Sequence, residues 1–245
     1  MRMHWGLFFE QAPFGGVQYY QWLLRGFAVT VELSVCAWVV AFLAGSVFGI
    51  MRTLPHRAFR AAGGFYVAVF RNIPLIAQFF VWYLVVPELL PGSLGRDLKA
   101  MDPEIQFFIL AVACLGLFTG GRICEQVRSG IQAQSRGQLS AGLALGLTLP
   151  QCYRHVIMPN AYRIIMPPMT SEILNMIKNS AVASTIGVID LSAQANRLLE
   201  YSARPYESFI AITLAYVTLN FTVMFLMRLL ERKIRVPGST GGRHV

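Results

Sequence analysis

Apolar segments about as long as a bilayer is thick recur along this chain of 245 residues. A helix needs roughly 20 mostly apolar residues to cross the hydrocarbon core of a membrane, since each residue adds about 1.5 Å. Apolar residues make up 55% of the chain and charged residues only 13%, unlike an average soluble domain. The sequence therefore predicts an all-α membrane protein. Its five expected spans cover about residues 27–51, 65–86, 105–123, 162–186 and 207–230.

The segments outside these spans suggest a simple domain organisation. Residues 1–25 are rich in aromatic side chains, which favour the membrane interface, and we expect a periplasmic or interfacial segment there. One membrane domain is expected over residues 26–230, interrupted by a polar loop at residues 138–161. Residues 231–245 form a basic tail.

Lys and Arg residues are unevenly distributed between the flanks of the expected spans. The segment before the first span and the loops after the second and fourth spans together hold six Lys and Arg residues. The other three flanks hold 13. Because cytoplasmic flanks are enriched in Lys and Arg, this pattern predicts a periplasmic amino terminus and a cytoplasmic carboxyl terminus. The net charge of +9 then largely reflects how the chain is oriented in membrane lipid, and no nucleic-acid partner is expected.

The central loop Gln138–Ala161 has the pattern of two short helices joined by a glycine turn. Its first half carries small residues at helical spacing: Ser140, Ala141, Gly142 and Ala144. Gly146 follows, and Pro150 is suited to open a second helix, which we expect to stop at Pro159. Small residues on one face let another backbone approach closely, so we interpret the loop as a docking surface on the inner face of the membrane.

The fourth expected span is unusually polar. Its polar residues form one stripe: Thr170, Ser171, Glu172, Asn175, Lys178, Asn179 and Ser180. Ionisable groups that face lipid cost several kcal/mol, so this stripe should face a bundle interior or a watered cavity. Pro167 and Pro168 are expected to break the helix just before it, which is tolerated where backbone lines a cavity. We interpret the stripe as a pathway for a polar solute; a polar contact between helices is the alternative.

Other charged residues near the spans also have two interpretations. Arg71, followed by Asn72 and Pro74, would either bind an anionic group or anchor the second span at the cytoplasmic interface, and the anchor is preferred. Arg122 and Glu125 are about one helical turn apart, so a local ion pair is the simplest expectation.

Motifs for catalysis and nucleotide binding are missing from the sequence. It contains no G-x-x-x-x-G-K-[ST], H-E-x-x-H or G-x-S-x-G pattern, so we expect neither an enzyme nor an ATP-binding protein. The four cysteines lack the paired spacing of a metal site, and no metal or cofactor is expected. Since the paired repeats of secondary transporters are also missing, a membrane subunit driven by separate subunits is favoured. A stand-alone channel or secondary carrier is the alternative.

The central loop resembles the "EAA…G…I-LP" motif of ABC importer permeases. In that family the short helices of the loop sit in a groove of the cytoplasmic ATPase and transmit its closure to the spans. The resemblance implies these ATPase-coupling residues: Ser140, Ala141, Gly142, Gly146, Leu149, Val156, Met158 and Pro159. The sequence departs from the motif at four places, where Ser140 replaces the Glu, Gly142 the second Ala, Val156 the Ile and Met158 the Leu.

Further segments resemble the polar amino-acid branch of these permeases. They are Phe70–Ile76, Lys178–Ala181 and Ser184–Gly187. More narrowly, four segments resemble the glutamate/aspartate uptake permeases: Gln11–Gly16, Gln78–Pro91, Leu115–Gln132 and Pro159–Ala181. The likeness extends from about Trp5 to Gly238.

The resemblance implies a type I ABC importer permease fold with five transmembrane helices and a cytoplasmic coupling helix. It further implies import of acidic amino acids, glutamate or aspartate, across a bacterial inner membrane. The implied partners are a homodimer of ABC ATPases that bind the ATP, a second related permease subunit and a periplasmic amino-acid-binding protein. Glutamine, arginine or histidine remains the alternative substrate.

Overall fold

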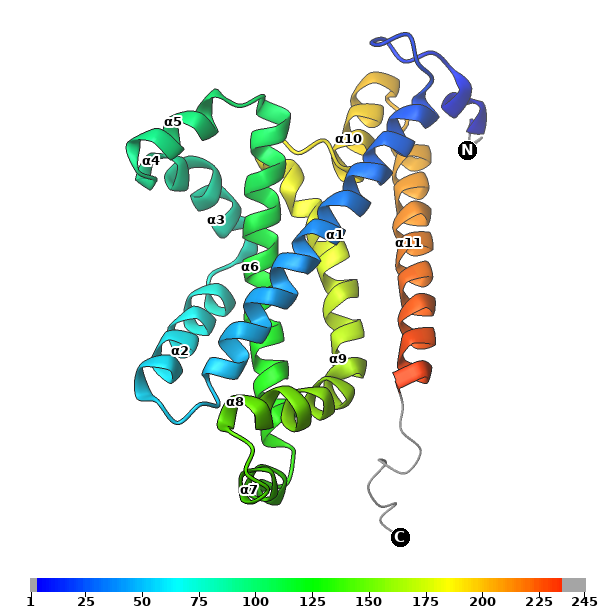
Figure 1. The fold of residues 1–245 in the computed structure, drawn as a ribbon. Helices are drawn as coiled ribbons and strands as arrows, with labels where there is room; N and C mark the ends of the chain where they lie inside the picture. The colour runs from blue at the N-terminus through cyan, green and yellow to red at the C-terminus, as the bar shows by residue number, and fades with distance from the viewer. Residues whose placement is uncertain (1–3, 235–245) are drawn as a thin grey trace.

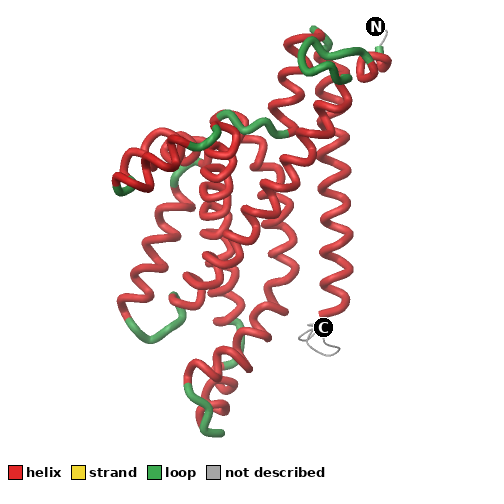
Figure 2. The backbone as a smooth tube through the Cα atoms, turned by 45° about the horizontal axis from the view of Figure 1, so that its top comes forward, coloured by secondary structure: helices red, strands yellow, loops and turns green. Residues whose placement is uncertain are grey.

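The fold is helical throughout the residues that the structure describes. The structure is a computed structural model, which describes residues 4–234. Within that range the only strand-like pairing is one isolated bridge between Gln11 and Gln18. Figure 2 shows helices joined by short loops along the whole described chain. The expected all-α architecture is therefore confirmed.

Four long helices run through the bundle (Figure 1): α1 Tyr19–Met51, α6 Pro103–Gln132, α9 Met158–Asn179 and α11 Pro205–Ile234. The shorter α-helices are α2 Arg57–Asn72, α3 Leu75–Phe80, α4 Val86–Leu89, α5 Gly92–Ala100, α7 Arg136–Ala144, α8 Leu149–Cys152 and α10 Leu191–Ser202. Two further segments are 3₁₀ helices, Trp5–Phe9 and Ser180–Ile186. Two others are π-helical turns, Val81–Val85 and Tyr153–Ile157.

Three of the described helices, α1, α6 and α11, are long and apolar enough to cross a membrane. The number rises to four if the bent pair formed by α2 and residues 75–89 is one span. The fourth expected span, residues 162–186, is helical in α9 and the 3₁₀ helix after it. It does not pass the same test of composition, because its charged residues and prolines make it too polar.

The second expected span, residues 65–86, is not one straight helix in the structure. The helix begins earlier, at Arg57, and the chain bends by 105° between α2 and the segment that starts at Leu75. Pro74 explains the break, because it lacks an N–H and disfavours helical geometry in Ile73, which is extended at φ −90° and ψ 130°. The buried Gln78 closes the gap by donating from Nε2 to the backbone carbonyls of Phe70 and Ile73.

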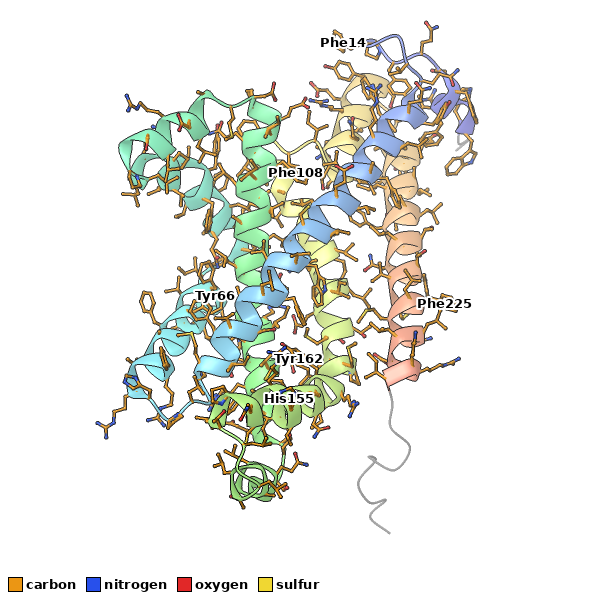
Figure 3. All side chains as sticks on the ribbon, in the orientation of Figure 1. Phe14, Tyr66, Phe108, His155, Tyr162 and Phe225 are labelled. Carbon is orange, nitrogen blue, oxygen red and sulfur yellow. The ribbon has the colours of Figure 1, made fainter. Side chains whose placement is uncertain are left out.

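Close packing of α1 on α6 forms the centre of the fold. A Cβ added to Gly45 of α1 would lie 2.6 Å from the side chain of Ile123 in α6, so only glycine fits at this separation. The helix α2 approaches α6 in the same way, because Tyr66 lies over Gly120 and its hydroxyl donates to the carbonyl of Leu117 at 2.7 Å. Figure 3 labels Tyr66 on α2. Small residues thus set the distances between helices.

The loops gather at two opposite ends of the bundle (Figure 1). The amino-terminal segment and α10 lie at one end, and α7, α8 and the last turn of α11 lie at the other. The first helix is longer than expected, since α1 begins at Tyr19, inside the segment assigned to the interface. The predicted tail begins inside α11, which ends at Ile234, and its remainder lies outside the described residues.

Candidate functional site

The central loop forms a helical hairpin that projects from one end of the bundle (Figure 1), as α7 and α8 joined by a turn at Gly146. Gly146 has φ +84°, a left-handed conformation that disfavours residues with a Cβ. Its N–H donates to the carbonyl of Leu143 at 3.0 Å. The next N–H, from Leu147, donates to the carbonyl of Gly142 at 3.1 Å. This pair of bonds is the Schellman ending of a helix, and it confirms the predicted glycine turn.

The second helix of the hairpin begins as the sequence predicts. Pro150 lies in the first turn of α8, where a missing N–H has no cost. Thr148 and Gln151 form a capping box, in which the backbone N–H of Thr148 donates to Gln151 Oε1 at 2.8 Å. The two helices pack tightly, because a Cβ added to Gly142 would lie 2.8 Å from Cys152 Sγ. The hairpin is therefore a preformed, rigid element.

The expected stop at Pro159 is wrong. A π-helical turn, Tyr153–Ile157, joins α8 directly to α9, and Pro159 is the second residue of α9. Proline is tolerated there because it follows the π-helical turn, where the regular i→i−4 ladder is already interrupted. The helix α9 also continues through Pro167 and Pro168, so the expected break at these prolines is wrong too. The hairpin is thus coupled rigidly to α9.

Side-chain contacts also tie the hairpin to other helices. The hydroxyl groups of Tyr153 and Thr53 lie 3.1 Å apart, which links the π-helical turn to the end of α1. Gln134, just after α6, donates from Nε2 to the carbonyl of Ile157 at 2.9 Å. Movement of the hairpin would therefore be transmitted to α1, α6 and α9.

The predicted coupling residues all lie in this hairpin or just after it. Ser140, Ala141, Gly146 and Pro159 are exposed, Leu149, Val156 and Met158 are half-buried, and Gly142 is buried. The hairpin also exposes two leucines, Leu143 at 46% and Leu145 at 83%, on an end of the molecule that projects from the bundle. Sequence reasoning missed these two residues, although they are apolar side chains in a polar loop.

The predicted polar stripe on α9 is divided between neighbouring helices. Ser171 and Lys178 are exposed, Glu172, Asn175 and Asn179 are half-buried, and Ser180 is buried. Thr170 donates to Glu231 Oε1 of α11 at 2.8 Å, and Ser180 donates to the carbonyl of Ile177 at 2.8 Å. The stripe therefore combines contacts to neighbouring groups with two exposed residues, and the pathway stays a prediction.

Lys178 lies at a cavity of about 620 Å³ between α9, α10 and α11. The cavity is mostly apolar, but Ser192, Tyr216 and Asn220 also line it, and Lys178 is the only charged residue among its lining residues. The Oδ1 atom of Asn220 is buried and accepts no hydrogen bond from the described residues. A polar or anionic group would find one cation and several hydrogen-bonding groups here.

Asp190 is fully buried beside this cavity, in the loop before α10. Its carboxylate caps α10 by accepting from the N–H of Ala193 at 2.9 Å, and Tyr216 donates to it at 3.4 Å. Burial raises the pKa of Asp190 to about 6, despite the hydrogen bonds that oppose this shift. The pKa of this buried carboxyl therefore lies above the ordinary value of 3.8.

The expected local ion pair between Arg122 and Glu125 is wrong. Arg122 Nη1 instead lies 3.8 Å from Glu172 Oε2 on α9, and its guanidinium lies over the ring of Phe118 at 5.2 Å. Glu125 contacts three other arginines: Arg52, Arg71 at 3.9 Å and Arg128 at 3.3 Å. Helix packing thus pairs residues that are distant in sequence.

The preferred interpretation of Arg71 as an interface anchor is also wrong. Because α2 begins at Arg57, Arg71 lies about four turns into the helix, at the break before α3. There its stem packs against Gly121, one residue before Arg122. The sequence shows that Arg71 and Arg122 lie inside apolar segments. It does not show that they meet Glu125 and Glu172.

No group of three or more metal-ligating side chains occurs among residues 4–234. The predicted site residues form two candidate regions: the exposed helical hairpin at one end, and the polar stripe of α9 and the residue after it.

Comparisons with known proteins find relatives along nearly the whole chain. The family described as "Binding-protein-dependent transport system inner membrane component" matches residues 41–236. The chain is 59% identical over 241 residues to the "Glutamate/aspartate import permease protein GltJ" of Escherichia coli (strain K12), with 98% of each chain covered. It is 29% identical to the "Glutamate/aspartate import permease protein GltK" of Escherichia coli O6:H1, covering 86% of this chain and 93% of GltK.

The fold is also similar to a solved structure described as "Crystal structure of an amino acid ABC transporter with histidines". The TM-score is 0.72 at 29% identity, and the likeness covers 88% of this chain and 95% of the other. The resemblance inferred from sequence segments is therefore confirmed over nearly the whole chain.

Proposed function

The chain belongs to the family of binding-protein-dependent transport system inner membrane components, and we propose that it is the permease subunit of an importer for acidic amino acids. As a member of this family it is a multi-pass protein of the bacterial inner membrane. It is a transport subunit and not the enzyme of the system, because ATP hydrolysis belongs to partner subunits and no cofactor is expected in the family.

The proposed substrate rests on one observation. The chain shares 59% identity with a glutamate/aspartate import permease, over 98% of both chains. Identity to the probable glutamine permease GlnM of Bacillus subtilis is only 29%. The difference in identity favours glutamate and aspartate over other polar amino acids.

The hairpin of α7 and α8 is the proposed docking element for the ATPase. Its exposed surface offers small residues, such as Ser140 and Ala141, beside the apolar side chains of Leu143 and Leu145. Such a surface suits insertion into a groove of another protein. Because the hairpin continues rigidly into α9, closure of the ATPases would move α9 and bias the permease between two states.

The proposed orientation in the membrane rests on the same arrangement. The hairpin and the end of α11 lie at one end of the bundle, and the chain segments at this end are the ones richer in Lys and Arg residues. The positive-inside rule supports a cytoplasmic hairpin and carboxyl terminus, with the amino-terminal segment in the periplasm.

The partners follow from the family and from the proposed substrate. They are a homodimer of ABC ATPases, a second and related permease subunit, and a periplasmic amino-acid-binding protein. The likeness to both GltJ and GltK supports a pair of different permeases. The proposed substrate pathway is the polar stripe that ends α9, from the exposed Ser171 through Glu172, Asn175, Lys178 and Asn179 to the buried Ser180.

Uptake by the complete complex in proteoliposomes tests the proposal. With ATP inside and binding protein outside, wild type should import glutamate and aspartate in preference to glutamine, arginine and histidine. Gly146→Val should abolish uptake, because valine is strained at φ +84° and the turn between α7 and α8 would distort.

The matched control is Gly92→Ala in α5, outside the hairpin, where an added Cβ has no described neighbour within 4 Å. It should leave uptake unchanged. Preferential import of another amino acid would overturn the substrate, and normal uptake by Gly146→Val would overturn the role of the hairpin.

A further inference from the structure

The arginine cluster between α2, α6 and α9 contains more positive than negative groups. Four arginines lie within ion-pair distance of only two carboxylates: Arg52, Arg71 and Arg128 at Glu125, and Arg122 at Glu172. A guanidinium stays charged in a protein. Because arginines outnumber carboxylates here, the cluster favours binding of an additional anion.

Glu172 and Arg122 are only loosely paired. Their closest atoms are 3.8 Å apart, beyond hydrogen-bond distance, and the buried Glu172 Oε2 accepts no hydrogen bond from the described residues. The pair therefore lacks the short, charge-assisted bonds of a structural salt bridge. A carboxylate that reached the guanidinium directly would bind it more strongly than Glu172 does.

The donors of the two outermost arginines are available. The side chains of Arg71 and Arg122 are 47% and 39% exposed, whereas that of Glu172 is only 13% exposed. Within residues 4–234, no hydrogen bond from either guanidinium is found. Arg71 packs against Gly121, the residue before Arg122, and both arginines interact electrostatically with the carboxylate of Glu172.

We propose that Arg122, assisted by Arg71, binds a carboxylate of the transported acidic amino acid, and that Glu172 holds Arg122 while substrate is absent. The inference rests on the proposed function, because it explains selectivity for a substrate with a second carboxylate. Glu172 is then a competitor of the substrate. Binding adds a carboxylate to a cluster in which arginines outnumber carboxylates, so the bound substrate offsets part of the excess positive charge.

Binding of radiolabelled glutamate to the complete permease–ATPase complex in nanodiscs, without the binding protein, tests this inference. Arg122→Gln should raise the Kd for glutamate by about 10- to 100-fold, the value of a charge-assisted hydrogen bond, and Arg122→Lys should recover part of the loss. Glu172→Gln should lower the Kd, because it removes the competitor. A purely structural ion pair would weaken binding in both variants.

Arg96→Gln is the matched control, since Arg96 is an exposed arginine of α5 that, within residues 4–234, donates only to the carbonyl of Gly92. It should leave the Kd unchanged. If Arg122→Gln binds glutamate as tightly as wild type, or if Glu172→Gln binds it more weakly, the inference is overturned. The proposed function is not affected as long as the wild-type complex imports acidic amino acids. Failure of the wild-type complex to import acidic amino acids would instead overturn the proposed function, and the inference with it.

Discussion

The side-chain Nε2 of Gln78 lies 2.9 Å from the backbone carbonyl oxygen of Ile73 and also donates to that of Phe70, at 3.1 Å. These two carbonyls are freed where Pro74 ends α2, and no water is available in a bilayer core to satisfy them. A single buried side chain thus closes the break in the second apolar segment.

Replacement of Gln78 tests this relationship. Gln78→Leu should lower the stability of the folded complex by about 2–4 kcal/mol, because two carbonyls lose their donor. The apparent melting temperature of the purified complex measures the effect. Asn72→Ala is the control, since Asn72 is exposed and bonds only within its own helix, and it should change little. Equal stability of the two variants would contradict the role of Gln78.

A second prediction concerns the contact of α2 with α6. Gly120→Ala should destabilise the complex by about 1–3 kcal/mol, because the added methyl group would collide with the Tyr66 hydroxyl that bonds Leu117. Gly64→Ala, in α2, has no neighbour within 4 Å and should stabilise slightly through helix propensity. Thermal unfolding of both variants distinguishes a steric effect from a general effect of alanine. Similar shifts in both would contradict close packing at Gly120.

Tyr162 joins α9 to α1 through a hydrogen bond from its hydroxyl to Ser46 Oγ at 2.7 Å, and Figure 3 labels it near the hairpin. Tyr162→Phe should cost about 1 kcal/mol and keep the stacking on Phe42. A double-mutant cycle with Ser46→Ala measures the interaction itself. Strictly additive effects would show that the hydrogen bond contributes nothing.

The buried Asp190 should make stability depend on pH. Its pKa of about 6 lies above the ordinary value of 3.8, so the folded protein binds the proton more tightly than the unfolded chain. Its contribution is therefore fully present below about pH 4 and is lost as the pH rises through 6, by about 3 kcal/mol at most.

Melting temperatures of wild type and Asp190→Asn at several pH values measure this contribution. The variant keeps a side-chain oxygen for the cap of α10, and its stability relative to wild type should rise between pH 4 and pH 7. A constant difference across this range would contradict the raised pKa.

The sequence by itself determined the parts of the fold that depend on local chemistry. The apolar lengths located α1, α6 and α11, because crossing a bilayer requires a certain number of residues. The turn at Gly146 and the start of α8 near Pro150 were also predictable, since glycine and proline act through their own backbone geometry.

Only the tertiary structure decided which charged residues meet. Spacing along one helix suggested that Arg122 pairs with Glu125, but Arg122 faces Glu172, which is 50 residues away on α9. Arg71 reaches the same region only because α2 begins early, bends away at Pro74 and packs against Gly121. Distances between helices depend on the packing of small residues from separate segments, and sequence spacing reports only neighbours on the same helix.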